Sequence, residues 1–144
     1  MKFKYRRYLA QLADGVAPLT VYRPVVPLNL HGPKAIARRM ALVDTGADFT
    51  LLPQSLGIEL GIVLERDGTI ELTGVGHSTI EASPATVTFE LRQGSESVRW
   101  EGRAYFADQD YLLLGNEGFL ERFKATFDWS QKSLELLSTD IDRN

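Results

Sequence analysis

The sequence predicts a single domain built mainly of β-strands. Apolar residues occur in short runs or alternate with polar ones, and glycine, proline, aspartate and serine interrupt them every few residues. This pattern is typical of strands joined by turns. At 144 residues the chain has the length of one domain, and a domain of this size buries roughly 68% of its unfolded surface without disulfides or metal. Its composition, 44% hydrophobic and 24% charged, is that of a globular protein.

Local patterns predict the individual elements. Val87, Phe89 and Leu91 alternate with polar residues, as in a half-buried strand, whereas Leu56 and Leu60 share one face of a short helix. In the first half of the chain we expect two strands within 19–30, a buried strand at 40–43, a short helix that begins at Pro53, and a hairpin with arms at 70–73 and 80–82. In the second half we expect a second hairpin with arms at 86–91 and 98–100, a strand at 111–114, a short helix at 117–123, and a last hairpin with arms at 125–127 and 134–136.

Charge and composition exclude several classes of function. Sixteen basic and nineteen acidic residues give a net charge of -3, so the chain lacks the positive field that gathers nucleic acid. It has no run of about 20 apolar residues for a membrane helix, and the basic residues at 2–7 precede no apolar stretch of a signal peptide. Cysteine is absent, which removes thiol chemistry. We therefore expect a soluble, cytoplasmic protein without nucleic-acid or membrane partners.

One stretch indicates chemistry. An apolar strand runs into Asp44, Thr45 and Gly46, which are followed by Ala47 and Asp48. A strand that ends on a carboxylate holds that group rigidly in a partly dry place, and a glycine lets the backbone approach a partner closely. The same three residue types are common in ordinary turns, and the tripeptide arises by chance in about 3% of chains this long. The motif alone thus marks Asp44 as a candidate catalytic carboxylate.

The surroundings of the motif narrow the interpretation. Residues 42–48, with 51–53 after them, resemble the active-site loop of the retropepsin-like aspartic peptidases. Two further matches follow in the family's order. Residues 73–77 resemble its flap, and residues 112–115 resemble its second hallmark, a hydrophobic pair and a glycine before the C-terminal helix. The matches span about residues 19–137 of the single domain, and the ordered combination is more specific than the tripeptide.

The resemblance implies a small closed antiparallel β-barrel of the acid-protease type that acts as an aspartic endopeptidase on peptide or protein substrates. One such motif per chain implies a homodimer, in which the two Asp44 carboxylates share a proton and activate water without a cofactor. The residues implied for the site are Asp44 as the catalytic group, Thr45, Gly46 and Ala47 in support, Asp48, Gly74, Val75, Gly76 and His77 at the substrate, and Leu114, Gly115 and Asn116 in the second hallmark.

Two features leave alternatives open. Asn116 stands where the retroviral enzymes commonly carry an arginine that pairs with the acid equivalent to Asp48, and an amide bonds a carboxylate without charge. Fold does not guarantee activity, so the main alternative is a catalytically weak or inactive dimerisation or peptide-binding module. No metal site is expected, because His31 and His77 lack the spacing of zinc ligands. On its glycine-rich tip, His77 either contacts substrate or is merely solvated.

Overall fold

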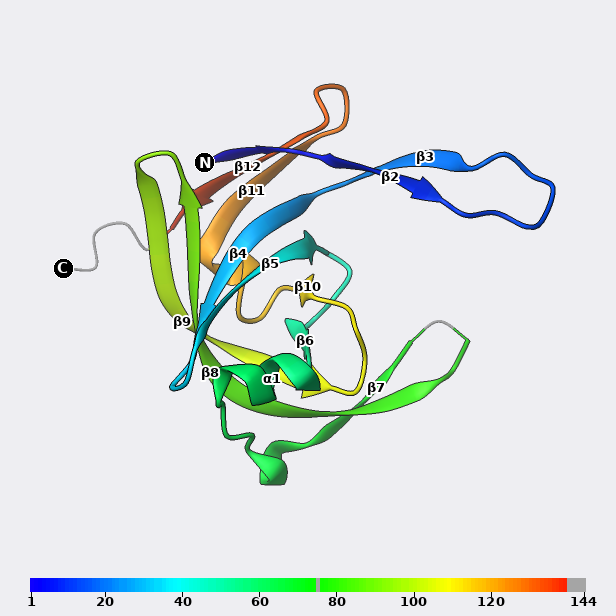
Figure 1. Cartoon of the computed structure of the whole chain (residues 1–144). Coiled ribbons are helices and arrows are strands. Elements are labelled where there is room, and N and C mark those ends of the chain that lie inside the picture. The colour runs from blue at the N-terminus through cyan, green and yellow to red at the C-terminus, as the bar shows by residue number, and fades with distance from the viewer. Residues whose placement is uncertain (75, 140–144) are drawn as a thin grey trace.

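Strands dominate the computed structural model, which describes residues 1–74 and 76–139 (Figure 1). The strands are β1 (Lys2–Lys4), β2 (Arg6–Ala10), β3 (Leu19–Arg23), β4 (Val25–His31), β5 (Ile36–Val43), β6 (Leu51–Pro53), β7 (Ile70–Thr73), β8 (Thr79–Gln93), β9 (Glu96–Ala107), β10 (Leu113–Leu114), β11 (Phe123–Asp128) and β12 (Ser133–Ser138). The helical elements are α1 (Gln54–Leu60) and two 3₁₀ turns, η1 (Arg66–Gly68) and η2 (Leu120–Arg122). Among the described residues, no helix has the length and apolar character needed to cross a membrane.

A closed ring of strands forms the body of the molecule. The order of pairing is β4, β5, β10, β6, β9 and β8, and β8 returns to pair with β4, while β7 extends the sheet beyond β8. Most of these pairings are antiparallel, but β5 pairs with β10 and β6 with β9 in parallel. The predicted mainly β architecture is therefore confirmed, with the difference that the ring is mixed rather than wholly antiparallel.

An aromatic cluster fills one end of the core. The ring of Trp100 stacks on Phe89 at 5.5 Å between centroids and meets Phe123 edge-on at 5.2 Å. Phe119, fully buried, lies 5.1 Å from Phe123. The indole Nε1 of Trp100 donates to the carbonyl oxygen of Gly118 at 2.9 Å. These contacts tie the segment after β10 to β8 and β9.

The structure changes the extent of several predicted elements. The helix expected from Pro53 is confirmed as α1, although it begins one residue later, at Gln54, because Pro53 still belongs to β6. The helix expected at 117–123 is wrong: only the three-residue turn η2 forms there, and Phe123 already begins β11. Gly118 has a φ of 91°, outside the right-handed helical region, and the aromatic cluster holds Phe123 in extended backbone. The arms expected at 80–82 and 86–91 belong to one long strand, β8, and the strand expected at 111–114 shortens to β10.

The two strands expected within 19–30 are confirmed as β3 and β4, whereas the segment before them forms strands β1 and β2 that the sequence patterns did not predict. Strand β1 pairs with β12, which also pairs with β11, so both ends of the described chain lie in one small sheet. The outer edge of β1 is covered by Gln93, whose side chain accepts from the backbone N–H of Lys2 at 2.7 Å and donates to its carbonyl oxygen. Strands β2 and β3 pair only with each other and project from the body as a separate hairpin (Figure 1).

A polar cluster bridges the seam where β4 meets β8 and closes the ring. The Nε2 atom of His31 lies 2.9 Å from Oε2 of Glu90, and both side chains are 15% exposed. The guanidinium of Arg92 contacts the other carboxylate oxygen at 3.0 Å. The hydrogen bond from His31 is the main cause that lowers the pKa of Glu90, while Asn29 and Arg92 act in the same direction and burial opposes them.

This cluster generates a pH-dependent prediction for stability. Because the folded protein lowers the pKa of Glu90 from its usual 4.5, its contribution is complete at neutral pH and is lost as the pH falls through the folded pKa. We expect Glu90→Gln to lower the free energy of unfolding by about 1–3 kcal/mol at pH 7, and by much less well below pH 4.5. Urea denaturation at both pH values measures this difference, with the exposed Glu101→Gln as control. Equal losses at both pH values would contradict the assignment.

Candidate active site

Asp44 is the first residue after β5, and hydrogen bonds fix its position. Its backbone N–H donates to the carbonyl oxygen of Leu114 at 3.0 Å, which ties it to β10. Its own carbonyl oxygen accepts from the N–H of Ala47 at 3.2 Å, closing a tight turn. The N–H of Gly46 donates to the carboxylate oxygen Oδ1 at 2.9 Å. The carboxylate is half-buried and oriented, and its second oxygen has no hydrogen-bond partner within the described part of the chain.

The loop after β5 is joined by its backbone to the segment after β10. The N–H of Asn116 donates to the carbonyl oxygen of Ala47, and that of Glu117 donates to the carbonyl oxygen of Asp48, both at 2.9 Å. In the opposite direction, the N–H of Thr50 donates to the carbonyl oxygen of Glu117 at 3.1 Å. The two segments form a ladder although they lie far apart in the sequence. The second-hallmark residues predicted from the sequence therefore lie directly beside the candidate catalytic loop.

Gly115 makes this close approach feasible. A Cβ atom at this position would lie 2.3 Å from the carbonyl oxygen of Phe49 and 2.7 Å from that of Ala47. Real Cβ atoms do not come so near to a backbone oxygen, so any other residue would push the two segments apart. The leucine before it, Leu114, is fully buried and anchors the same segment in the core.

Thr50 is a supporting residue that the sequence patterns did not identify. Its side chain is fully buried, and its hydroxyl donates to the carbonyl oxygen of Glu117 at 2.9 Å while accepting from the N–H of Gly115 at 3.3 Å. It thus satisfies backbone groups that the core would otherwise leave without a partner. The signal in the sequence is a single hydroxyl among Phe49, Leu51 and Leu52, since a polar group in so apolar a run is buried and needs partners.

The outer edge of the loop is open. Thr45, Gly46 and Asp48 are exposed, whereas Ala47 is half-buried. One chain therefore presents the Asp44 carboxylate, which backbone hydrogen bonds hold in place, beside residues that are exposed to solvent. Within residues 1–74 and 76–139, no group of three or more histidine, aspartate or glutamate side chains is arranged to hold a metal ion.

The predicted flap is a hairpin between β7 and β8. The N–H of Gly74 donates to the carbonyl oxygen of Ser78 at 3.0 Å, and Gly76 and His77 have φ values of 86° and 63° that turn the chain. Gly74, Gly76 and His77 are exposed, and Val75 lies outside the described residues. The hairpin projects on the same side of the body as β2 and β3, with the loop after β5 between them (Figure 1). No hydrogen bond joins its described residues to the Asp44 loop.

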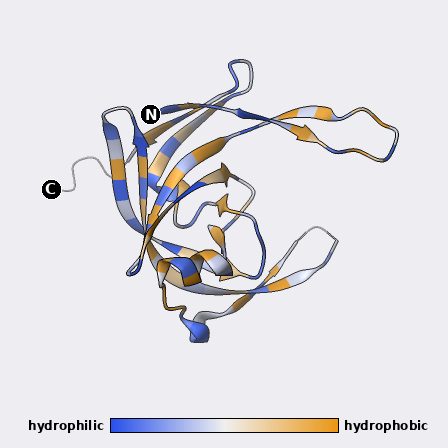
Figure 2. Cartoon of the chain, viewed as in Figure 1, coloured by the Kyte–Doolittle hydropathy of each residue, from blue (hydrophilic) through white to orange (hydrophobic). Residues whose placement is uncertain are grey.

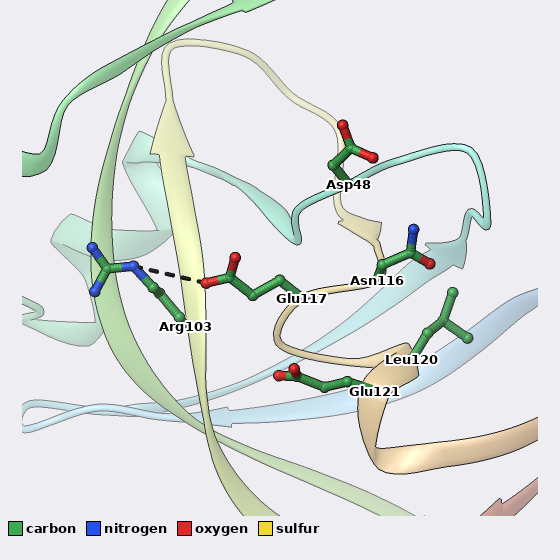
Figure 3. A pocket seen from close by; sticks show the side chains of 6 residues that line it. All are labelled: Asp48, Arg103, Asn116, Glu117, Leu120 and Glu121. Atoms are coloured by element: carbon green, nitrogen blue, oxygen red, sulfur yellow. Dashed lines mark ion pairs between the residues drawn. The ribbon is translucent and has the colours of Figure 1, made fainter.

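An open hollow of about 660 Å³ lies beside Asp48. Figure 3 shows the side chains that line it: Asp48, Arg103, Asn116, Glu117, Leu120 and Glu121. Glu117 points toward Arg103, whose Nε lies 3.8 Å from its carboxylate. The pKa of Arg103 is raised, first by its bond with the Tyr105 side chain and then by Glu65 and Glu117. No hydrogen bond joins the Asn116 amide to the Asp48 carboxylate in the described residues, so the backbone ladder holds the two segments together.

The ladder generates a prediction for Gly115. We expect Gly115→Ala to lower the free energy of unfolding by at least about 2–3 kcal/mol, because the new methyl group collides with two backbone carbonyls. The control is Gly94→Ala, in which the added Cβ meets nothing within 4 Å but the φ of 60° makes the substitution unfavourable by itself, by about 1–2 kcal/mol. Chemical denaturation of both variants measures the difference. A cost for Gly115→Ala no greater than that of the control would show that the contact is not tight.

Sequence comparison gives no relatives. No protein-family profile matches the chain, and no curated protein matches it. Similarity is found instead with solved structures. A retropepsin-like aspartic protease from Rickettsia conorii superposes with a TM-score of 0.56 at 19% sequence identity, over 95% of this chain and 98% of that one.

A second solved structure is the EIAV protease complexed with the inhibitor HBY-793, with a TM-score of 0.47 and 22% identity. That match covers 65% of this chain and 82% of the viral one. At these identities the similarity concerns the fold alone. The match to the Rickettsia conorii protein extends over nearly the full length of both chains. The chain therefore has a retropepsin-like fold.

Proposed function

We propose that this protein is an aspartic endopeptidase that works as a homodimer, with water activated between the Asp44 carboxylates of two chains. The observation that carries the proposal is the Asp44 loop itself. A half-buried carboxylate, oriented by Gly46 and held by the ladder to the segment after β10, stands at an exposed edge. The retropepsin-like fold supports this assignment, since its solved relative from Rickettsia conorii is described as an aspartic protease.

The chemistry explains why one chain is insufficient. Hydrolysis of an amide needs a base that takes a proton from water and an acid that protonates the carbonyl oxygen. Two carboxylates within hydrogen-bond distance cannot both ionise without a large repulsive cost, so they retain one proton between them and supply both roles. The sequence contains one Asp-Thr-Gly motif. A twofold axis beside Asp44 brings in the second carboxylate.

The residues around Asp44 take supporting roles in this scheme. The exposed Thr45 and Gly46 are free to meet their counterparts in the second chain. Asp48, which is exposed in the same loop, is assigned to bind the backbone of an extended peptide. The hairpin tip, with Gly74, Val75, Gly76 and His77, would close over that peptide and exclude water.

The peptide-binding alternative has weaker support. It rests on Asn116, an amide in place of an arginine. Yet the N–H of Asn116, not its side chain, bonds the candidate catalytic loop, so the change leaves the ladder in place. We therefore favour the enzyme, with peptides or proteins of the cytoplasm as its substrates.

Digestion of a peptide library, followed by mass spectrometry at several pH values, tests the proposed activity. We expect cleavage by the wild-type protein and a loss of at least about a thousandfold for Asp44→Asn, because an amide neither donates the shared proton nor accepts one from water. The matched control is Asp67→Asn at an exposed position in η1, which we expect to keep full activity. Equal cleavage by the wild-type and Asp44→Asn proteins would refute the assignment.

Mixed dimers test whether the site is shared. A wild-type chain paired with an Asp44→Asn chain keeps the fold and the loop but lacks the second carboxylate. After exchange of subunits, wild-type activity should fall to about half with an equal amount of the variant and to about a tenth with a ninefold excess, as expected for random pairing. As a control, the Asp67→Asn protein replaces the Asp44→Asn protein in the same mixtures, where it should cause no loss of wild-type activity. Activity that stayed unchanged with excess Asp44→Asn would show that each chain works alone.

A further inference from the structure

The hairpin formed by β2 and β3, which we call the arm, has no layer that covers it. Its five cross-strand pairs run from Arg6 opposite Arg23 to Ala10 opposite Leu19. None of residues 6–23 is buried, and Leu9 and Leu19 are 67% and 54% exposed. Figure 2 shows apolar stretches along the arm where it leaves the body. A two-stranded ribbon with both faces in water is marginally stable, so an arm of this kind needs a surface to pack against.

Pairing defines which side chains share a face. Residues directly opposite each other in an antiparallel ribbon point to the same side, so Tyr8 lies with Val21 and Ala10 with Leu19 on one face. Leu9 and Thr20 belong to the opposite face. We call the first the inner face.

The inner face continues into a hollow at the foot of the arm whose lining is mostly apolar, with Arg23 and Asp110 as its two charged residues. This hollow, of about 190 Å³, is lined by Tyr8, Arg23, Val25, Met40, Leu42, Asp110, Tyr111, Leu112 and Leu113. Tyr111 and Met40 are 71% and 40% exposed on its rim. Leu42 belongs to β5, the strand that ends immediately before Asp44. The inner face therefore runs from Leu19 near the end of the arm, through Val21 and Tyr8, to this hollow beside β5, and Arg6 and Arg23 lie over the Tyr8 ring at its foot.

Charge favours a second copy of this chain as the occupant. The arm carries three arginines, Arg6, Arg7 and Arg23, and one acid, Asp14, which gives residues 6–23 a charge of +2. The whole chain carries -3, so the remainder carries -3 - (+2) = -5. A basic arm is thus attracted to the acidic body of another copy, and complementary charge of this kind guides association.

We propose that the inner face of the arm packs against the second copy in the dimer, so that each chain embraces the partner that completes its site. This inference rests on the proposed function for the identity of that partner. The arm projects on the same side as the loop that carries Asp44 (Figure 1), so a chain that brings its own Asp44 there meets the arm. Because β1 pairs with β12 within the same chain, the arm is the part of the N-terminal segment left free to reach across.

The test compares the same substitution on the two faces of the arm. Both variants are made in the Asp44→Asn background, so that dimerisation is measured independently of activity. We expect Leu19→Glu, which places a charge in the interface, to raise the dimer dissociation constant at least about tenfold in sedimentation experiments. Leu9→Glu, on the opposite face, should change it less than about threefold. Circular dichroism verifies that both variants keep their strands, and Leu19→Ala, with a smaller increase in the same direction, replaces Leu19→Glu if that variant misfolds.

The outcomes separate this inference from the proposed function. A dimer that dissociates equally in all variants would overturn the role of the arm while leaving the shared site standing. An effect of Leu9→Glu as large as that of Leu19→Glu would overturn the assignment of the inner face. If Leu19→Glu in the otherwise wild-type enzyme raised KM without weakening the dimer, the arm would bind substrate instead of the partner. A fully active protein that sediments only as a monomer would refute the shared site itself.

Discussion

The contact between Gly115 and the loop that carries Asp44 is the constraint on which the site depends. With no side chain at Gly115, the two segments approach until a Cβ would touch the carbonyl oxygens of Ala47 and Phe49. That approach places the backbone of Asn116 within hydrogen-bond distance of the loop. A carboxylate held by such a ladder is oriented before substrate arrives, and preorganisation of this kind is what electrostatic catalysis needs.

The rest of the structure divides between holding this loop and leaving it accessible. Pairing within the ring of strands holds β5 and β10 side by side, the aromatic cluster holds the segment after β10, and the buried hydroxyl of Thr50 bonds the backbone of that segment. Outward from that point the side chains are exposed, from Thr45 and Asp48 to the uncovered arm. In the proposed mechanism, a single chain is a complete scaffold but supplies only one of the two carboxylates. The proposed dimer supplies the missing carboxylate and the missing cover with the same partner.

The sequence predicted those elements whose conformation depends on neighbouring residues alone. The apolar run before Asp44 indicated a strand end, which is confirmed, and Pro53 indicated a helix, which begins one residue later at Gln54. The helix expected at 117–123 failed because tertiary contacts decide there: Gly118 takes a left-handed conformation and Phe123 is held by the aromatic cluster. The parallel pairings of β5 with β10 and of β6 with β9, and the hydrogen bonds of Thr50, join residues that lie far apart in the sequence. The local periodicity of apolar residues carries no information on which distant strands pair. Of the arm, the sequence predicted strand β3 but neither β2 nor its pairing with β3, because residues 6–10 show no clear alternation of apolar and polar side chains.

The central claim is that catalysis belongs to two chains and not to one. Its most direct test is the specific activity of the purified wild-type protein, measured during dilution through the dimer dissociation constant, with the monomer fraction followed by sedimentation. The account predicts that specific activity falls in proportion to the fraction of protein that remains dimeric, and that it returns on reconcentration. A dilute, demonstrably monomeric sample that kept its full specific activity would contradict it.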